Sequence, residues 1–180
     1  MKNFYLFAFI FFTQFALSNE LFKGENLLVE PPSTEIYKAY YKEKNGLKST
    51  TWASIELITK DTFTVNILSG SYSDLNRFRN IQDKPGKKAC SKFDSKDIDK
   101  FDRNGYKSLF WETTCILNGT PIQVLQLAIS GNDSLYHIRK LWQFQVSDSD
   151  YSDWKEQMIQ ISVCDTRKKR KMKHPCPSFK

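Results

Sequence analysis

Alternation of hydrophobic and polar residues predicts β-strands over much of the chain. Residues 62–67 alternate between polar and hydrophobic side chains, which is the pattern of a half-buried strand. A similar alternation runs through residues 50–58. We expect a turn at Lys60 and Asp61 between these two strands, and a single long bent strand is the alternative.

Three more strands are predicted in succession over residues 106–117, 121–130 and 134–145. The first two are separated by Asn118-Gly119 and the last two by residues 131–133, Gly-Asn-Asp. Short turns with these residues are typical of β-hairpins. The three strands are therefore expected to form an antiparallel meander.

The segment before residue 50 is less regular. Residues 27–30 form a short extended run that Pro31-Pro32 stops. Residues 36–43 fit either a strand or a short helix, because their periodicity favours neither.

Two short helices are predicted between the strands. Ser73 has the side chain of an N-cap, and we expect the first helix to follow it and to end at residues 83–86, Asp-Lys-Pro-Gly. The second is expected over residues 95–103, with Ile98 and Phe101 on one side and Asn104-Gly105 as its stop.

A longer helix is predicted near the C-terminus. Residues 147–150, Ser-Asp-Ser-Asp, offer a cap and acidic first-turn side chains, and hydrophobic residues then recur at helical spacing. These hydrophobic residues are Tyr151, Trp154, Met158 and Ile161. The pattern predicts an amphipathic helix that lies on a sheet. The expected fold class is α+β, a largely antiparallel sheet flanked by helices.

The first 18 residues are interpreted as a secretory signal peptide. Lys2 supplies the positive charge, residues 4–12 form an apolar run, and residues 16–18, Ala-Leu-Ser, place small residues at a cleavage site. A membrane-spanning anchor is the competing interpretation, but Thr13 and Gln14 interrupt the apolar run, and a span needs about 20 apolar residues. We expect an exported protein, periplasmic or secreted, with no transmembrane segment after cleavage.

Export is consistent with the cysteines. The chain has four, Cys90, Cys115, Cys164 and Cys176, and an oxidising compartment permits disulfides. Three pairings are possible. We favour Cys90 with Cys115 and Cys164 with Cys176, because each bond joins neighbours in the sequence. A metal site is not expected, since the chain has no CxxC spacing.

The positive charge is concentrated at the C-terminus. The 180 residues include 27 Lys and Arg against 20 Asp and Glu, but residues 19–165 are nearly neutral. Six cations lie close together after Asp165: Arg167, Lys168, Lys169, Arg170, Lys171 and Lys173. We divide the chain into a signal peptide (1–18), one α+β domain (19–165) and a basic segment (166–180) closed by the Cys164–Cys176 disulfide.

That basic segment predicts a polyanion-binding element. In an exported protein the available polyanions are anionic lipids, polysaccharides or an acidic protein of the envelope or the secreted fraction, and nucleic acid is not expected. A solvated, self-repelling loop with no ligand is the alternative.

Part of the chain resembles a known group of proteins. The stretch LQLAISGNDSLY at residues 125–136, and the ending with residues 163–167 and Pro175-Cys176-Pro177, is similar to small secreted bacterial proteins with a PsbP-like α/β/α sandwich, most of unknown activity. In such proteins the cysteine corresponding to Cys90 faces the one corresponding to Cys115. The resemblance implies a binding or assembly module without a catalytic set. The basic insert between Cys164 and Pro175 departs from the expected pattern.

Few residues suggest catalysis. His137 and His174 are the two histidines, and His137 is expected in mid-strand, on the face opposite Tyr136 and Ile138. The acidic residues near Asn104-Gly105 fail as a calcium loop, because Lys100 stands where the first carboxylate is needed. Trp111, Trp142 and Trp154 could line a ligand groove together with Tyr40 and Tyr41, although such tryptophans are more often core residues.

These observations predict an exported, non-enzymatic binding or assembly module with no cofactor and no catalytic residues. Two alternatives remain open at this point. One is an accessory subunit of an envelope-spanning secretion system, and the other is a small secreted hydrolase whose site forms only in three dimensions.

Overall fold

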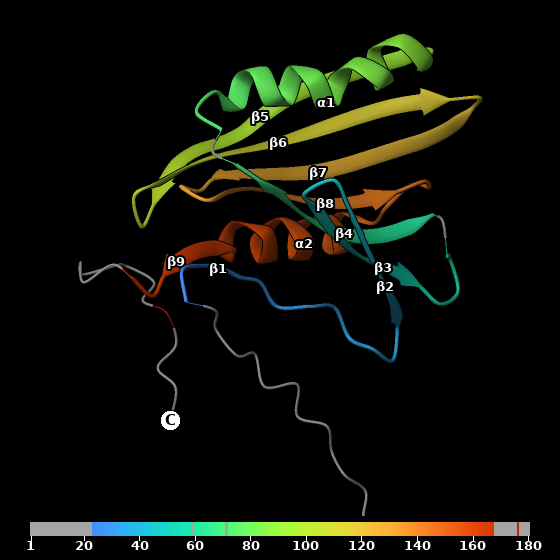
Figure 1. The fold of residues 1–180 in the computed structure, drawn as a ribbon. Helices are drawn as coiled ribbons and strands as arrows, with labels where there is room; N and C mark the ends of the chain where they lie inside the picture. The colour runs from blue at the N-terminus through green and yellow to red at the C-terminus, as the bar shows by residue number, and fades with distance from the viewer. Residues whose placement is uncertain (1–22, 59, 71, 168–175, 177–180) are drawn as a thin grey trace, which may run out of the picture.

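A seven-stranded antiparallel sheet forms the centre of the fold, in the order β2-β3-β4-β8-β7-β6-β5 (Figure 1). The computed structural model describes residues 23–58, 60–70, 72–167 and 176. Within these residues the strands of the sheet are β2 (Tyr37–Lys44), β3 (Leu47–Ser54), β4 (Asp61–Ser69), β5 (Lys92–Arg103), β6 (Tyr106–Leu117), β7 (Thr120–Ser130) and β8 (Ser134–Trp142). The fold is therefore α+β with a largely antiparallel sheet, and the predicted meander corresponds to β6, β7 and β8.

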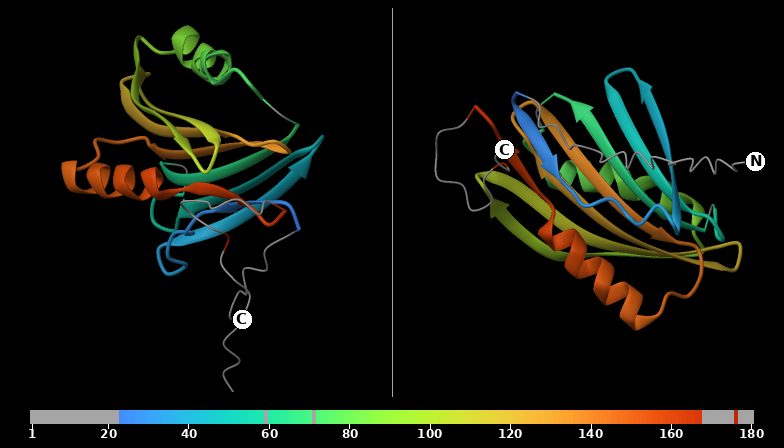
Figure 2. Two further views of the ribbon diagram at one scale, coloured as in Figure 1. Left: turned by 90° about the vertical axis from the view of Figure 1, so that its left-hand side faces the viewer. Right: turned by 90° about the horizontal axis from the view of Figure 1, so that it is seen from below.

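The remaining elements cover the two faces of this sheet. Helix α1 (Leu75–Ala89) lies on one face, and α2 (Asp148–Gln160) lies on the other (Figure 2). Next to α2, the short strands β1 (Glu25–Leu28) and β9 (Ser162–Asp165) pair with each other as a separate two-stranded ribbon.

Side-chain alternation along the strands divides the core into two parts. On the α2 face, Phe63, Phe110 and Leu127 belong to the larger cluster, which Met158 of α2 and Val163 of β9 complete. On the α1 face, a smaller cluster includes Phe78, Leu109 and Trp111. The sheet is thus buried from both sides where helices cover it, which accounts for the nearly continuous burial of central β7 and β8.

Three hairpins of the sheet turn at Asn-Gly pairs. Asn45-Gly46, Asn104-Gly105 and Asn118-Gly119 all have positive φ at both residues, the backbone geometry of a two-residue hairpin whose twist matches the strands. Asn104-Gly105 therefore joins β5 to β6. The prediction that it ends a helix was wrong.

The predicted helix over residues 95–103 is also wrong, because this segment belongs to the edge strand β5. A register shift lies between Asp97 and Asp99. This bulge interrupts the period-two alternation, so that Ile98 and Phe101, three residues apart, both pack against the larger core cluster. Their spacing imitated one face of a helix.

The limits of α1 also differ from the prediction. Its N-cap is Asp74, whose carboxylate accepts a hydrogen bond from the backbone N–H of Arg77 at 2.9 Å, and the helix continues through Pro85 and Gly86 to Ala89. A β-carbon on Gly86 would lie 2.5 Å from the Phe93 ring of β5. The glycine thus allows the helix to approach the sheet closely, and it does not end the helix.

Near the N-terminus, the ambiguous residues 36–43 correspond to a strand, β2. The extended run predicted over residues 27–30 overlaps β1 only at residues 27 and 28, because the strand lies two residues earlier. The predicted strand over residues 50–58 ends earlier, at Ser54. None of the helices formed by the described residues is long and apolar enough to span a membrane.

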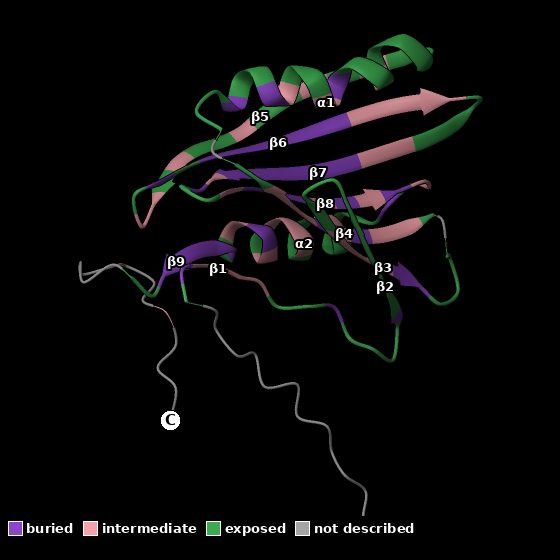
Figure 3. Cartoon of the chain, in the orientation of Figure 1, coloured by how far each residue is buried: buried purple, intermediate pink, exposed green. Residues whose placement is uncertain are grey.

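The helical cover of the sheet is incomplete on the α1 side. Helix α1 contacts β5, β6 and β7. At the other end of the sheet, no helix formed by the described residues lies on this side, and nearly all of β2 is exposed (Figure 3). Part of the sheet therefore presents its side chains to solvent.

Candidate functional site

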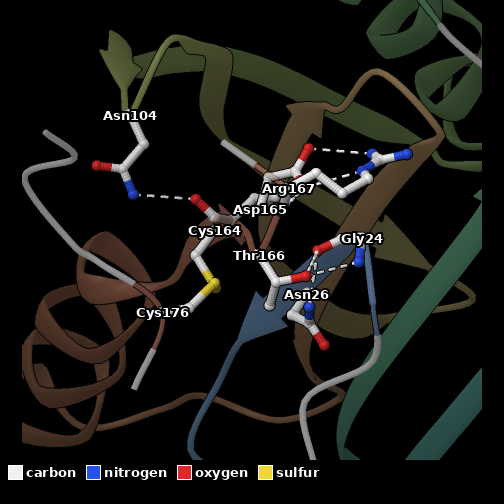
Figure 4. Close-up of a disulfide and its surroundings, with 9 residues drawn as sticks. Gly24, Asn26, Asn104, Cys164, Asp165, Thr166, Arg167 and Cys176 are labelled. Atoms are coloured by element: carbon white, nitrogen blue, oxygen red, sulfur yellow. Dashed lines mark hydrogen bonds and ion pairs between the residues drawn. A yellow bond between two sulfur atoms is a disulfide. The ribbon is translucent and has the colours of Figure 1, made fainter. Parts of the chain in front are cut away.

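Both predicted disulfides are present. Cys90 follows the C-terminus of α1 and bonds to Cys115 of β6, and Cys164 of β9 bonds to Cys176, with a Cα–Cα distance of 5.3 Å in the second pair. The first bond fastens the end of α1 to the sheet. The second fastens the C-terminal segment to the β1–β9 ribbon (Figure 4).

The ribbon that carries Cys164 is held firmly to the body of the protein. Asn26 pairs with Cys164 in the β1–β9 register. Beyond the last strand pair, the backbone N–H of Thr166 donates to the Gly24 carbonyl at 3.0 Å, and the Gly24 N–H donates to the Thr166 hydroxyl at 2.8 Å. From the β5–β6 hairpin, the side-chain amide of Asn104 donates to the Val163 carbonyl at 3.0 Å.

Arg167, the first of the six predicted polyanion-binding residues, is bound to two carboxylates of the protein itself. Its guanidinium lies 3.0 Å from Asp165 Oδ2 and 2.5 Å from Asp133 Oδ2. Hydrogen bonds to these two carboxylates raise the pKa of Arg167. Arg167 is therefore suited to hold the chain in place, because its charge is already balanced.

The other five predicted residues lie outside the described part of the structure: Lys168, Lys169, Arg170, Lys171 and Lys173. They stand between two anchored positions, the paired guanidinium of Arg167 and the disulfide at Cys176. This sequence stretch is consequently closed at both ends on the β1–β9 ribbon. Its five cations are accompanied by no acidic residue.

His137, one of the two histidines considered for catalysis, is buried beneath α1 on the face predicted for it. Its ring stacks parallel to that of Trp111 at 5.8 Å between centroids, and the Phe78 ring meets it edge-on at 5.0 Å. Its Nε2 lies 3.2 Å from Gln126 Oε1. Burial, and secondarily the charge of Arg139, lowers the pKa of His137 to about 3. With 2% of its surface exposed, the imidazole is placed for packing and not for contact with a substrate.

On the opposite face, Lys140 is a fully buried cation that the sequence did not single out. Its ammonium donates to Asp61 and, at 2.8 Å, to the Tyr37 hydroxyl. It also lies 4.1 Å from the Trp154 ring centroid and 5.3 Å from that of Trp142. Burial lowers the pKa of Lys140, although its hydrogen bond to Asp61 acts in the opposite direction. The arrangement is a buried ion pair enclosed by aromatic rings.

A cavity of about 520 Å³ opens at the end of the sheet near the start of α2. Its lining includes Lys92, Asp94, Gln123 and Phe144. Gln123 also donates to the buried carboxylate of Glu112 at 2.6 Å.

Glu112 has further partners besides Gln123. The Lys96 ammonium lies 2.9 Å from Glu112 Oε2. Burial, followed by the charge and hydrogen bond of Glu112, raises the pKa of the Tyr151 hydroxyl to about 12. The negative charge of the Glu112 carboxylate is thus compensated by its neighbours. Among the described residues, no group of three His, Cys, Asp or Glu could hold a metal ion.

The aromatic residues considered for a ligand groove do not come together. Trp111 belongs to the core on the α1 face, whereas Trp142 and Trp154 pack on the α2 face. The core interpretation of these tryptophans is therefore correct. Tyr40 and Tyr41 of β2 are exposed, on opposite faces of the strand.

Comparisons with known proteins assign no family. No family model and no curated protein matches the chain. Among solved structures, the chain is similar to a Pseudomonas aeruginosa protein of unknown function, PA94, at 12% identity and a TM-score of 0.38 over 79% of this chain and 85% of that one.

Proposed function

We propose that this protein is an exported, non-enzymatic binding module that engages an anionic lipid or polysaccharide surface through its basic C-terminal segment. One observation supports this most directly. Residues 168–175 are bounded by Arg167, which two carboxylates hold, and by Cys176, which a disulfide joins to Cys164.

Closure at both ends favours binding for an entropic reason. Cross-linking a loop removes conformational freedom that a free tail would otherwise lose on binding, so the closed segment has a smaller entropy cost to bind. The five cations between the anchors are attracted to anionic surfaces, with about 1 kcal/mol for each Lys or Arg that comes near a membrane.

Export and the family resemblance belong to the same proposal. The apolar N-terminal run supports a cleaved signal peptide, and the two disulfides support an oxidising compartment, periplasmic or extracellular. The layering of one helix, an antiparallel sheet and a second helix supports a PsbP-like sandwich closed by an amphipathic C-terminal helix.

The test uses defined anionic surfaces. Binding of the mature, oxidised protein to dextran sulfate and to phosphatidylglycerol vesicles is measured before and after changing Lys168, Lys169, Arg170 and Lys171 to Gln. We expect the variant to bind at least tenfold more weakly. A matched control removes four charges elsewhere, at Lys48, Lys84, Lys88 and Lys155. If both variants bind equally to both surfaces, the segment has no specific role and the proposal is wrong.

A further inference from the structure

The uncovered part of the sheet carries an ordered set of polar side chains on the α1 side. In the strand register, Arg139 of β8 pairs with Thr64, Thr64 with Thr51, and Thr51 with Tyr40 of the edge strand β2. These four residues form one row across the sheet. Neighbouring strands are about 4.8 Å apart, so Arg139 and Tyr40 are separated by about 14 Å.

A second row of residues runs beside the first, and both rows consist of polar side chains. Lys42 pairs with Ser49, and Ser49 pairs with Asn66. The hydroxyl groups of Thr51 and Thr64 are 3.1 Å apart and half-buried. The middle of this surface therefore consists of hydroxyl and amide groups that can donate and accept hydrogen bonds. We call these two rows, together with Lys38 and Lys44 on the same face of β2, the open face.

Charge on the two sides of these strands is unequal. In strands β2, β3, β4 and β8, no acidic side chain lies on the α1 side. Their acidic residues, Glu43 and Asp61, lie on the α2 side. The cations of the open face are Lys38, Lys42, Lys44 and Arg139. The open face is thus uniformly positive on a domain that is close to neutral.

Arg139 is the most informative of these cations. No described residue forms an ion pair with it, and its buried Nε has no hydrogen-bond partner in the part of the chain that the structure describes. Burial lowers the pKa of Arg139. A partly buried guanidinium without a counter-charge costs stability, so its presence calls for an anion that the described residues do not supply.

Edge protection explains only part of this surface. Lysines on an exposed edge strand prevent pairing with another sheet, which accounts for Lys38, Lys42 and Lys44 on β2. Arg139 lies three strands inside the edge, where no such protection is needed. The guanidinium is also the group that binds carboxylate and sulfate with two parallel hydrogen bonds.

We infer that the open face binds an acidic polysaccharide, with Arg139 contacting an acidic group and Tyr40 stacking on a sugar ring. An acidic peptide fits less well, because peptide recognition relies on apolar pockets for side chains and the middle of this face consists of Ser, Thr and Asn. A polysaccharide offers hydroxyl groups that these Ser, Thr and Asn side chains can bind, and Tyr40, which is 47% exposed, offers its ring for stacking. This surface is separate from the C-terminal segment, so each can fail without the other.

Titration calorimetry with polygalacturonate tests the inference, with neutral dextran and polyglutamate as comparison polymers. We expect Arg139→Gln to weaken polygalacturonate binding at least tenfold without lowering the midpoint of thermal unfolding, because an unpaired buried charge is removed. Lys38→Gln/Lys42→Gln should weaken it more than Lys48→Gln/Lys155→Gln, which removes the same charge from the α2 side. Tyr40→Ser should weaken binding several-fold.

Several results would overturn the inference. If Arg139→Gln binds polygalacturonate as tightly as the wild type, Arg139 does not contact the polymer. If this variant has a lower midpoint of thermal unfolding, the role of Arg139 is structural. If polyglutamate binds as tightly as polygalacturonate and Tyr40→Ser has no effect, the open face binds acidic peptides. If neutral dextran binds as tightly as polygalacturonate, charge does not drive the binding. If only the change of residues 168–171 abolishes polygalacturonate binding, the ligand belongs to the C-terminal segment, whereas loss in the open-face variants alone leaves that segment without this role.

Discussion

The Lys140 Nζ lies over the indole ring of Trp154, 4.1 Å from the ring centroid, at the contact between β8 and α2. The positive charge is balanced by Asp61, which comes from the neighbouring strand β4. The helix is therefore packed on a charge that the sheet itself neutralises.

Removing only the negative partner should be strongly destabilising. In Asp61→Asn, Lys140 stays buried without a counter-charge, and we expect a loss of about 3–5 kcal/mol in the free energy of unfolding. The double variant Asp61→Asn/Lys140→Met should recover most of this loss, because a hydrophobic side chain of similar length replaces the cation. Urea denaturation measures both. Equal losses in the single and double variants would show that the charge is not the cause.

Gly86 should be intolerant of a methyl group although it lies inside a helix. Alanine is normally favoured over glycine there by about 1 kcal/mol. Here its β-carbon would meet the Phe93 ring at 2.5 Å, so Gly86→Ala should instead destabilise the protein by about 1–2 kcal/mol.

Thermal unfolding of two further variants isolates the cause. Gly86→Ala/Phe93→Leu should be more stable than the sum of its single changes, because the smaller side chain leaves room for the methyl group. Lys84→Ala, on the exposed side of the same helix, should be nearly neutral. A Gly86→Ala protein as stable as the wild type would contradict the close packing of α1 on β5.

The burial of His137 makes stability depend on pH. Its pKa is about 3 in the folded protein and about 6.5 in the unfolded chain, so the neutral imidazole contributes stability that is complete above pH 6.5. As the pH falls from 6.5 toward 3, the unfolded chain binds a proton that the folded protein does not bind. The free energy of unfolding should then decrease by about 1.4 kcal/mol per pH unit.

The measurement compares the wild type with His137→Gln by urea denaturation at pH 7 and pH 5. The wild type should lose about 2 kcal/mol more than the variant over this interval, since only the wild type carries the buried imidazole. All other titrating groups are common to both proteins and cancel. Parallel losses in the two proteins would mean that His137 titrates normally and is accessible to solvent.

The strands of the meander could be predicted because their information is local. Alternation of side chains and the Asn118-Gly119 turn are both encoded by neighbouring residues. Asn45-Gly46 carries the same signal for the β2–β3 hairpin, and it would have decided between strand and helix for residues 36–43.

Other features depend on contacts between distant segments. The bulge in β5 placed Ile98 and Phe101 on one face and so gave a helix-like spacing, and Gly86 followed Pro85 in a pattern that usually ends a helix. The pairing of Lys140 with Asp61 joins residues 79 positions apart. The row from Arg139 to Tyr40 exists only in the sheet register. The sequence therefore predicted the disulfides and the basic segment, but it could not identify the open face.

Loop closure is the central claim, and affinity for dextran sulfate with and without the C-terminal disulfide tests it most directly. The comparison uses the wild type and the variant Cys164→Ser/Cys176→Ser, which keeps every cation of residues 167–173, at a temperature where circular dichroism shows both to be folded. The closed wild type should bind at least threefold more tightly, because the opened segment loses more conformational freedom on binding. Equal affinity of the two proteins would contradict the claim.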